Sequence, residues 1–333
     1  MPIKMFISIL ITGFAIGVIA VVILRKASLR YRLLLNQQGM PLVGGVAAAI
    51  VFIALSAVFI YPVLKPGLKG IIFSSLLMFL FGIIDDRREL SVVAKFAVQV
   101  VATGVLMVFG VRAQIVYIGN ILNTAITFLW MIGITNAFNH LDVSDGLATG
   151  TTIMIGLSLF IIAFTNHDPD TALLALVVTA SALSCFAYNF PPAKIYLGNA
   201  GSHFLGFLMA GIALTISYAP LERKVALFSP LVIFGLPIID TAFLVLARLQ
   251  KKKLPFNKSD DHPALRLLAR GYSKKKTLFV MLTFCFAFCF FGTLLSQVSN
   301  ILGAIIFFII AAITLFFLRK VSSRKVKQAT IHG

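Results

Sequence analysis

The stretch that decides the fold is LKGIIFSSLLMFLFGIIDDRREL, at residues 68–90. It begins as an apolar run and passes directly into two carboxylates and two arginines. About 20 predominantly apolar residues are enough for a helix to cross a bilayer. The apolar part therefore predicts a membrane-spanning helix that ends at a water-facing surface beside Asp85 and Asp86.

The rest of the 333-residue chain has the same character. Hydrophobic residues make up 59% of it and charged residues 12%, whereas soluble domains average about 45–50% and about 25%. These values exclude a soluble globular protein, a disordered chain and a disulfide-stapled secreted domain. The three cysteines lie inside apolar runs, which is typical of buried packing residues. We predict an all-α polytopic membrane protein that forms one membrane-embedded domain over residues 1–333.

Eleven stretches are apolar and long enough, or nearly long enough, to span a bilayer, with ten as the alternative count. They lie at roughly 5–24, 42–62, 68–84, 92–111, 122–138, 150–165, 171–188, 203–219, 225–247, 277–296 and 299–318.

The distribution of basic residues predicts the orientation. With the N-terminus outside, only six of the 29 Lys and Arg residues would face outward: Lys4, Lys65, Lys69, Arg112, Arg223 and Lys224. Cytoplasmic loops carry an excess of Lys and Arg, so we expect the N-terminus outside, the C-terminus in the cytoplasm and a basic cytoplasmic tail at 319–333. The longest inner loop, 248–276, is basic and is expected to hold a short helix at 263–270. The net charge of +18 then indicates contact with an anionic leaflet and not with nucleic acid.

The carboxylates are scarce and unevenly placed. Most of the eleven lie at or near the predicted inner face: Asp85, Asp86, Glu89, Asp142, Asp145, Asp240, Asp260 and Asp261. Any one of them beside an inner Arg is more often a surface ion pair, and Asp240 alone could be a helix-pairing residue. Adjacent carboxylates, however, stay ionised together most easily around a cation. Oxygen ligands favour Mg²⁺, with Mn²⁺ as the alternative, and the sequence has no His/Cys cluster at zinc-ligand spacing.

Five motifs occur in order along the chain: PLVGG (41–45), DDRRELS (85–91), NAFNHLDVSDGL (136–147), LGNAGS (197–202) followed by Gly206, and PIID (237–240). Together they resemble the polyprenyl-phosphate N-acetylhexosamine-1-phosphate transferases, the integral membrane enzymes that include WecA and the MraY translocase. The resemblance covers about residues 36–275, and the second motif is closer to the WecA type.

The resemblance implies an enzyme that transfers N-acetylhexosamine-1-phosphate, with GlcNAc-1-phosphate favoured, from a UDP-sugar to undecaprenyl phosphate and releases UMP. This would be the first membrane step of a cell-envelope polysaccharide such as O-antigen. The expected location is the bacterial cytoplasmic (inner) membrane, multi-pass, with the active site on the cytoplasmic face. The expected partners are undecaprenyl phosphate, the UDP-sugar and the bilayer, without nucleic acid, and a homodimer is compatible with them.

The resemblance also assigns roles to residues. The catalytic carboxylates would be Asp85, Asp86, Asp142 and Asp145, with Asp85 as the candidate to take a residual acceptor proton or to position the lipid phosphate. The Mg²⁺ ligands would be Asp86, Asp142, Asp145 and Asn199. The substrates would be met by Asn139, Asn189, Gly201, Ser202, Asp240 and His262. Arg266, or another basic residue of the same loop, would replace the family's missing loop histidines at the donor diphosphate.

Two departures from the family pattern matter. Asn199 stands where the family has an Asp, so one negative charge is missing and weaker cation binding is expected. The last inner loop reads SDDHPAL (259–265), where only His262 matches the family's histidines. Asn199 leaves open a member that has lost catalysis and acts as a binding or assembly subunit. Within the enzyme class the alternative is a UDP-MurNAc-pentapeptide phosphotransferase, against which the DDRREL motif and the missing His triplet argue, and a transporter is the more remote alternative.

Overall fold

The structure, a computed structural model, describes residues 3–59, 65–218, 223–252 and 261–322. Within these ranges the chain is built from helices, and only the isolated bridge between Leu35 and Pro41 has β geometry. The helices, in chain order, are α1 (Ile3–Tyr31), α2 (Gly44–Phe59), α3 (Pro66–Arg87), α4 (Val92–Val108), α5 (Gly119–Leu141), α6 (Leu147–Thr165), α7 (Pro169–Asn189), α8 (Gly198–Thr215), the 3-10 helix η2 (Lys224–Phe228), α9 (Ser229–Ile233), α10 (Gly235–Gln250), α11 (Pro263–Ala269), α12 (Lys274–Leu295) and α13 (Asn300–Ser322).

Helix occupies every one of the eleven predicted spans, which confirms an all-α polytopic membrane protein. By length and composition, seven of the described helices can cross a membrane, and one bent pair can form an eighth span. Helices α2 and α4 are also apolar but shorter, at 16 and 17 residues. The count of eleven and the orientation of the termini stay predictions.

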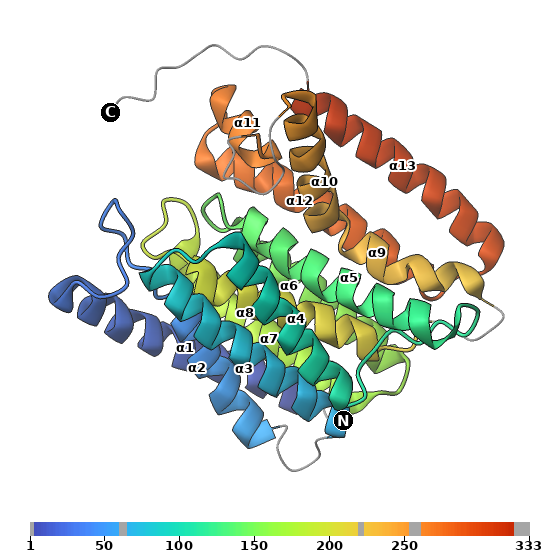
Figure 1. The fold of residues 1–333 in the computed structure, drawn as a ribbon, viewed down its shortest axis with the longest axis horizontal. Helices are drawn as coiled ribbons and strands as arrows, with labels where there is room; N and C mark the ends of the chain where they lie inside the picture. Colours follow the sequence, from blue (N-terminus) through green and yellow to red (C-terminus); the bar gives the residue numbers. More distant parts are fainter. Residues whose placement is uncertain (1–2, 60–64, 219–222, 253–260, 323–333) are drawn as a thin grey trace.

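The helices are arranged around α7 and α8. In the most apolar 18-residue window of α7, 78% of the residues are buried, against 17% in α13. In α8 nearly every side chain from Ala200 to Ala213 is buried. Figure 1 shows α1–α8 as one bundle, with α9–α13 along one side of it. The outer helices expose large apolar side chains, as lipid-facing helices do.

The predicted span at 225–247 is broken. The segment Lys224–Ile233 meets α10 at an angle of 68°. The break falls at Phe234, directly before Gly235, and Pro237 lies in the first turn of α10. A proline there loses no helical hydrogen bond, because the first turn of a helix has no acceptor for its amides. The short helix α11 confirms the helix expected at 263–270.

Glycines bring three helices into backbone contact at the start of α8. A Cβ on Gly45 of α2 would lie 2.2 Å from the amide nitrogen of Gly201, and one on Gly82 of α3 would lie 2.4 Å from the Cα of Ala200. Small residues allow such close approach between membrane helices. The amides of Gly44 and Gly45 also donate to the carbonyls of Tyr196 and Leu197, at 3.0 and 2.9 Å. The first turn of α8 is therefore enclosed by α2 and α3.

The connections at the two ends of the bundle differ in chemistry. The loops after α1, α3, α5 and α7 lie at one end in Figure 1, and the N-terminus lies at the opposite end. The acidic motifs of the sequence belong to the first of these ends. At the other end, Lys65 joins α3 to α7 through ion pairs with Asp168 and Asp170, both at 3.3 Å.

Candidate active site

Asp86 lies against the N-terminus of α8. Its two carboxylate oxygens accept hydrogen bonds from the backbone amides of Asn199 and Ala200, at 2.8 and 3.0 Å. The first amides of a helix have no partner within the helix and carry partial positive charge. Asp86, at the end of α3, thus caps a helix that begins more than one hundred residues later in the sequence.

Asp142 approaches the same helix end from α5. It follows directly after α5 and accepts from the amide of Gly198. Burial raises the pKa of Asp142 well above its usual range, and the carboxylates of Asp86 and Asp145 add to that rise. Gly198 has φ +74°, and a Cβ there would lie 2.7 Å from Oδ2 of Asp86. Glycine is required at this position both for its backbone conformation and for room beside the carboxylate.

Two asparagines complete the group. The side-chain amide of Asn139 donates to Oδ1 of Asn199 and to the hydroxyl of Ser202, both at 2.9 Å. A carbonyl oxygen has two lone pairs, so the Asn199 oxygen keeps one available. Asp86, Asn139, Asp142 and Asn199 are all half-buried at this end of the bundle.

The other predicted residues of this region are held by the protein itself. Buried Asn189 accepts from the amide of Gly146 and donates to the carbonyl of Ile195, both at 3.0 Å. Gly201 is packed against Gly45, and Ser202 is fully buried. The substrate-binding roles of Asn189, Gly201 and Ser202 stay predictions, while their contacts in the structure organise the loops and the start of α8.

Asp85 and Asp145 are buried and paired with lysines. The Asp85 carboxylate accepts from Lys95 Nζ at 2.6 Å and from the amide of Leu90 at 2.8 Å. One oxygen of Asp145 accepts from Lys274 Nζ and from the amide of Ala193, both at 3.2 Å. The structure therefore distinguishes these two buried, lysine-paired carboxylates from the half-buried pair, Asp86 and Asp142.

The remaining predicted residues form a neighbouring group. Asp240 of α10 lies 3.0 Å from Nδ1 of His262, which precedes α11. Arg266 pairs with Asp261 at 3.0 Å, and its guanidinium stacks 4.6 Å from the ring centre of Phe243. The ring of His140, in the last turn of α5, lies 6.0 Å from that of His262 and links this group to Asn139. Asp260 lies outside the described residues.

The donor set at the start of α8 suits a hard divalent cation. Mg²⁺ is typically bound by one or two carboxylates together with water and substrate phosphates. Asp86 and Asp142 supply two carboxylates, and Asn199 supplies an amide oxygen. Among the described residues, no three His, Cys, Asp or Glu side chains gather into a metal-binding group. The residues therefore fit a cation that shares its coordination with a ligand, and not a closed protein cage.

Sequence reasoning missed three polar partners. Lys95 and Lys274 neutralise Asp85 and Asp145, and Gln99 of α4 exchanges hydrogen bonds with Asn136 of α5 at 3.1 and 2.8 Å. Only a weak indication of the lysine partners is present in the sequence. Each lysine lies in the first turn of an apolar helix on the predicted inner side, where lysines commonly extend their charged ends toward water. The Gln99–Asn136 pair shows that the first Asn of the 136–147 motif joins two helices.

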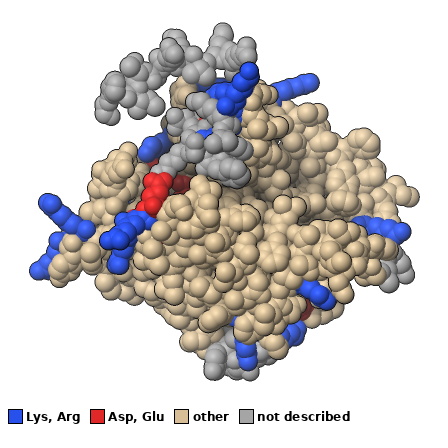
Figure 2. Space-filling view, viewed as in Figure 1, with Lys and Arg blue, Asp and Glu red and all other residues tan. Residues whose placement is uncertain are grey.

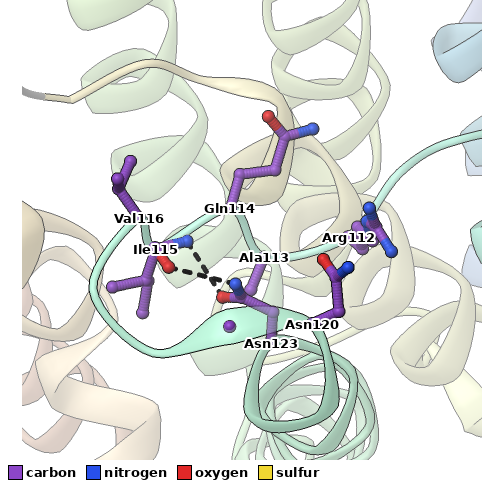
Figure 3. A pocket seen from close by; sticks show the side chains of 8 residues that line it. Arg112, Ala113, Gln114, Ile115, Val116, Asn120 and Asn123 are labelled. Carbon is purple, nitrogen blue, oxygen red and sulfur yellow. Dashed lines mark hydrogen bonds between the residues drawn. The ribbon is translucent and has the colours of Figure 1, made fainter.

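Figure 2 shows acidic atoms next to Lys and Arg side chains near this end, and further Lys and Arg side chains at the right and lower edges of the molecule. A hollow of about 320 Å³ lies at the other end, between Arg112 and Asn123 (Figure 3). There the Asn123 side chain bonds to both the amide and the carbonyl of Ile115, at 2.9 and 3.0 Å. Its lining has no carboxylate, so this hollow lacks the chemistry of the acidic site.

The site lies largely within the part of the chain that known proteins share. Residues 68–217 match Glycosyl transferase family 4. A "Probable undecaprenyl-phosphate N-acetylglucosaminyl 1-phosphate transferase" of Bacillus subtilis (strain 168) is 34% identical over 289 residues, which cover 81% of this chain and 77% of that protein. The chain belongs to glycosyl transferase family 4.

Other family 4 relatives agree with this assignment. A "Decaprenyl-phosphate N-acetylglucosaminephosphotransferase" of Mycolicibacterium smegmatis is 28% identical over 313 residues, covering 82% of this chain and 76% of the relative. A "Phospho-N-acetylmuramoyl-pentapeptide-transferase" of Streptococcus equi subsp. zooepidemicus is 28% identical over 204 residues, with coverages of 55% and 61%. The family predicted from the motifs is thus confirmed, and the relatives named for N-acetylglucosamine cover more of the chain.

The Asp85–Lys95 pair generates a stability prediction. Replacing Lys95→Met leaves a buried carboxylate without its cation, which should cost about 1–3 kcal/mol and lower the thermal unfolding midpoint in detergent. The double variant Asp85→Asn/Lys95→Met removes both charges and should recover most of the loss. A double variant no more stable than Lys95→Met would contradict the pairing.

Proposed function

We propose that this family 4 member transfers GlcNAc-1-phosphate from UDP-GlcNAc to undecaprenyl phosphate and releases UMP. The observation that carries the proposal is the convergence of Asp86, Asn139, Asp142 and Asn199 at the start of α8, half-buried at one end of a membrane bundle. The names of the relatives support the same acceptor class and the same sugar.

In the proposed step, an oxygen of the lipid phosphate attacks the β-phosphorus of the donor. A new P–O bond forms to the lipid, and the bond from the β-phosphorus to the oxygen bridging it to the α-phosphorus breaks. UMP leaves with that electron pair. Because a phosphate monoester is largely anionic near pH 7, with a second pKa of about 6, little proton removal is required. The protein contributes mainly alignment and charge neutralisation.

The acidic site needs a cation to receive such substrates. The α8 amides are already bonded to Asp86 and Asp142, so they are not free to bind the donor phosphates directly. We propose Mg²⁺ as the cofactor, held by Asp86 and Asp142 with the Asn199 oxygen beside them. When bound, it supplies neutralisation of the diphosphate charge. Asn139 holds Asn199 and Ser202 in place, and Asp145 stays with Lys274.

The contacts of Asp85 favour a supporting role. Its oxygens are bonded to Lys95 and to the Leu90 amide, so it fixes the turn that follows α3 and the start of α4. In this reading Asp85 sets the position of its neighbour Asp86, and the lipid phosphate reacts in its anionic form.

Loss of one charge at Asp86 gives the most direct test of the site. Asp86→Asn should lower UMP release in detergent, with UDP-GlcNAc, undecaprenyl phosphate and Mg²⁺, by at least about a hundredfold. Asp168→Asn is the matched control, because the same change at the other end of the bundle keeps a helix cap and should leave turnover near normal. Near-normal turnover in Asp86→Asn would overturn the assignment of this carboxylate.

Asn199 yields a prediction about the cofactor. Asn199→Asp adds a third carboxylate and should lower the Mg²⁺ concentration for half-maximal UMP release roughly tenfold, since ligand charge tunes affinity. The Mg²⁺-dependent rise in the thermal midpoint should shift in the same direction. Asn120→Asp, on the surface at the other end of the bundle, should change neither.

The Asn199 experiment also separates the second reading, a non-catalytic assembly subunit. That reading rests on the missing Asp. UMP release only in Asn199→Asp would favour it, whereas release by the unaltered protein supports the enzyme. Unchanged Mg²⁺ dependence in Asn199→Asp would contradict the placement of the cation.

We also infer that the acidic end faces the cytoplasm of a bacterial inner membrane. The described basic residues between Arg248 and Lys276, and those at the end of α1 (Arg25, Lys26, Arg30 and the following Arg32), belong to this end, as the positive-inside rule requires. In intact cells, a membrane-impermeant maleimide should label Lys224→Cys and leave Lys275→Cys unlabelled, and both should react in detergent. The three native cysteines are buried and give a low background. Labelling of Lys275→Cys from outside would reverse the topology.

A further inference from the structure

Asp240 lies at a buried position, where an ionised carboxylate is energetically unfavourable. It belongs to α10, six residues after the break at Phe234, and its side chain is completely buried. Taking an ionised carboxylate out of water costs several kcal/mol unless a partner compensates. Oδ2 has such a partner in Nδ1 of His262, at 3.0 Å, and Oδ1 has no hydrogen-bond partner within the described chain.

The contact pairs Nδ1 of His262 with a carboxylate oxygen of Asp240. With Asp240 ionised, Nδ1 is the donor, because an ionised carboxylate only accepts hydrogen bonds. The ring is then held through Nδ1, and Nε2 is turned away from Asp240. Carboxylates orient histidines in this manner in metal sites and in catalytic triads.

The surroundings show which part of the protein the ring adjoins. The His262 ring packs edge-on to His140, whose Nδ1 lies 3.3 Å from the hydroxyl of Thr241. His140 directly follows Asn139 and comes two residues before Asp142. In the part of the chain that the structure describes, Asp240 is the hydrogen-bond partner of the His262 ring, and Nε2 has no protein partner. His262 thus stands beside the acidic site with one nitrogen uncommitted.

We propose that Asp240 is a positioning residue that acts through His262. Its buried carboxylate does not contact substrate. It holds the Nδ1 proton and the ring plane of His262, so that Nε2–H of the protonated ring donates to a phosphate oxygen of the donor. That the ligand of His262 is a donor phosphate rests on the proposed function. The contact between Asp240 and His262 does not depend on that function.

Enzyme kinetics with purified full-length protein give the first test. Asp240→Asn keeps the size of the side chain but loses its charge, and it should raise the KM for UDP-GlcNAc at least about tenfold, as loss of an orienting partner typically does. The KM for undecaprenyl phosphate should stay within about twofold. In a His262→Ala background, Asp240→Asn should add little, because residues that act through one another are non-additive. Additive losses, or a loss confined to the lipid KM, would overturn the proposal.

Spectroscopy separates this proposal from the enzyme assignment. In protein labelled with ¹⁵N-histidine, the His262 signals, assigned by their absence in His262→Gln, should show a protonated Nδ1 and should move in Asp240→Asn. They should not move in Asp168→Asn. If the His262 signals move in Asp240→Asn but the protein releases no UMP, the proposed function is contradicted and the positioning role is not. If the protein releases UMP but the His262 signals do not move in Asp240→Asn, the positioning role is contradicted and the proposed function is not.

Discussion

The first turn of α8 is the constraint on which the rest of the structure depends. Its amides at Gly198, Asn199 and Ala200 are enclosed by other helices and need acceptors, because a buried donor without a partner costs about 1–3 kcal/mol. Asp142 and Asp86 supply those acceptors from α5 and α3. Glycines on α2 and α3 let the backbones approach closely enough for this to happen. The fold and the acidic site are therefore one arrangement, because the carboxylates that cap this helix end, Asp86 and Asp142, are the half-buried carboxylates of the site.

This constraint divides the carboxylates into two kinds. Asp86 and Asp142 keep access to the surface and repel each other, so they suit a cation and its anionic ligand. Asp85, Asp145 and Asp240 are buried, and each is compensated by one basic side chain, Lys95, Lys274 or His262. The Asp145–Lys274 pair joins segments 129 residues apart, while the other two pairs each join elements that are near in sequence. Whether a carboxylate is paired with a basic side chain thus distinguishes the residues that can meet substrate from those that support them.

Much of this could be predicted from the sequence. Apolar run length located helix at all eleven expected spans, and the carboxylates at the ends of the third and fifth spans were expected at one surface, where the structure brings Asp86 and Asp142 together. Gly235 and Pro237 indicate the break in the ninth span, whereas the hydropathy of that segment does not. The pairings were beyond reach: Lys274 meets Asp145 across 129 residues, and nothing local in either segment specifies the other. For the same reason the different surroundings of Asp85 and Asp86 could not be predicted, because only tertiary packing places one against Lys95 and the other against α8.

The central claim is that this site moves a sugar phosphate from a nucleotide to a lipid. Two samples of UDP-GlcNAc, labelled with ³²P at the β-phosphorus or at the α-phosphorus, would be incubated with the purified protein, undecaprenyl phosphate and Mg²⁺, and then extracted with organic solvent. If the protein transfers the sugar phosphate, the β-label enters the lipid phase while the α-label stays in water as UMP. A β-label that remains in water, or an α-label that enters the lipid phase, would contradict this transfer.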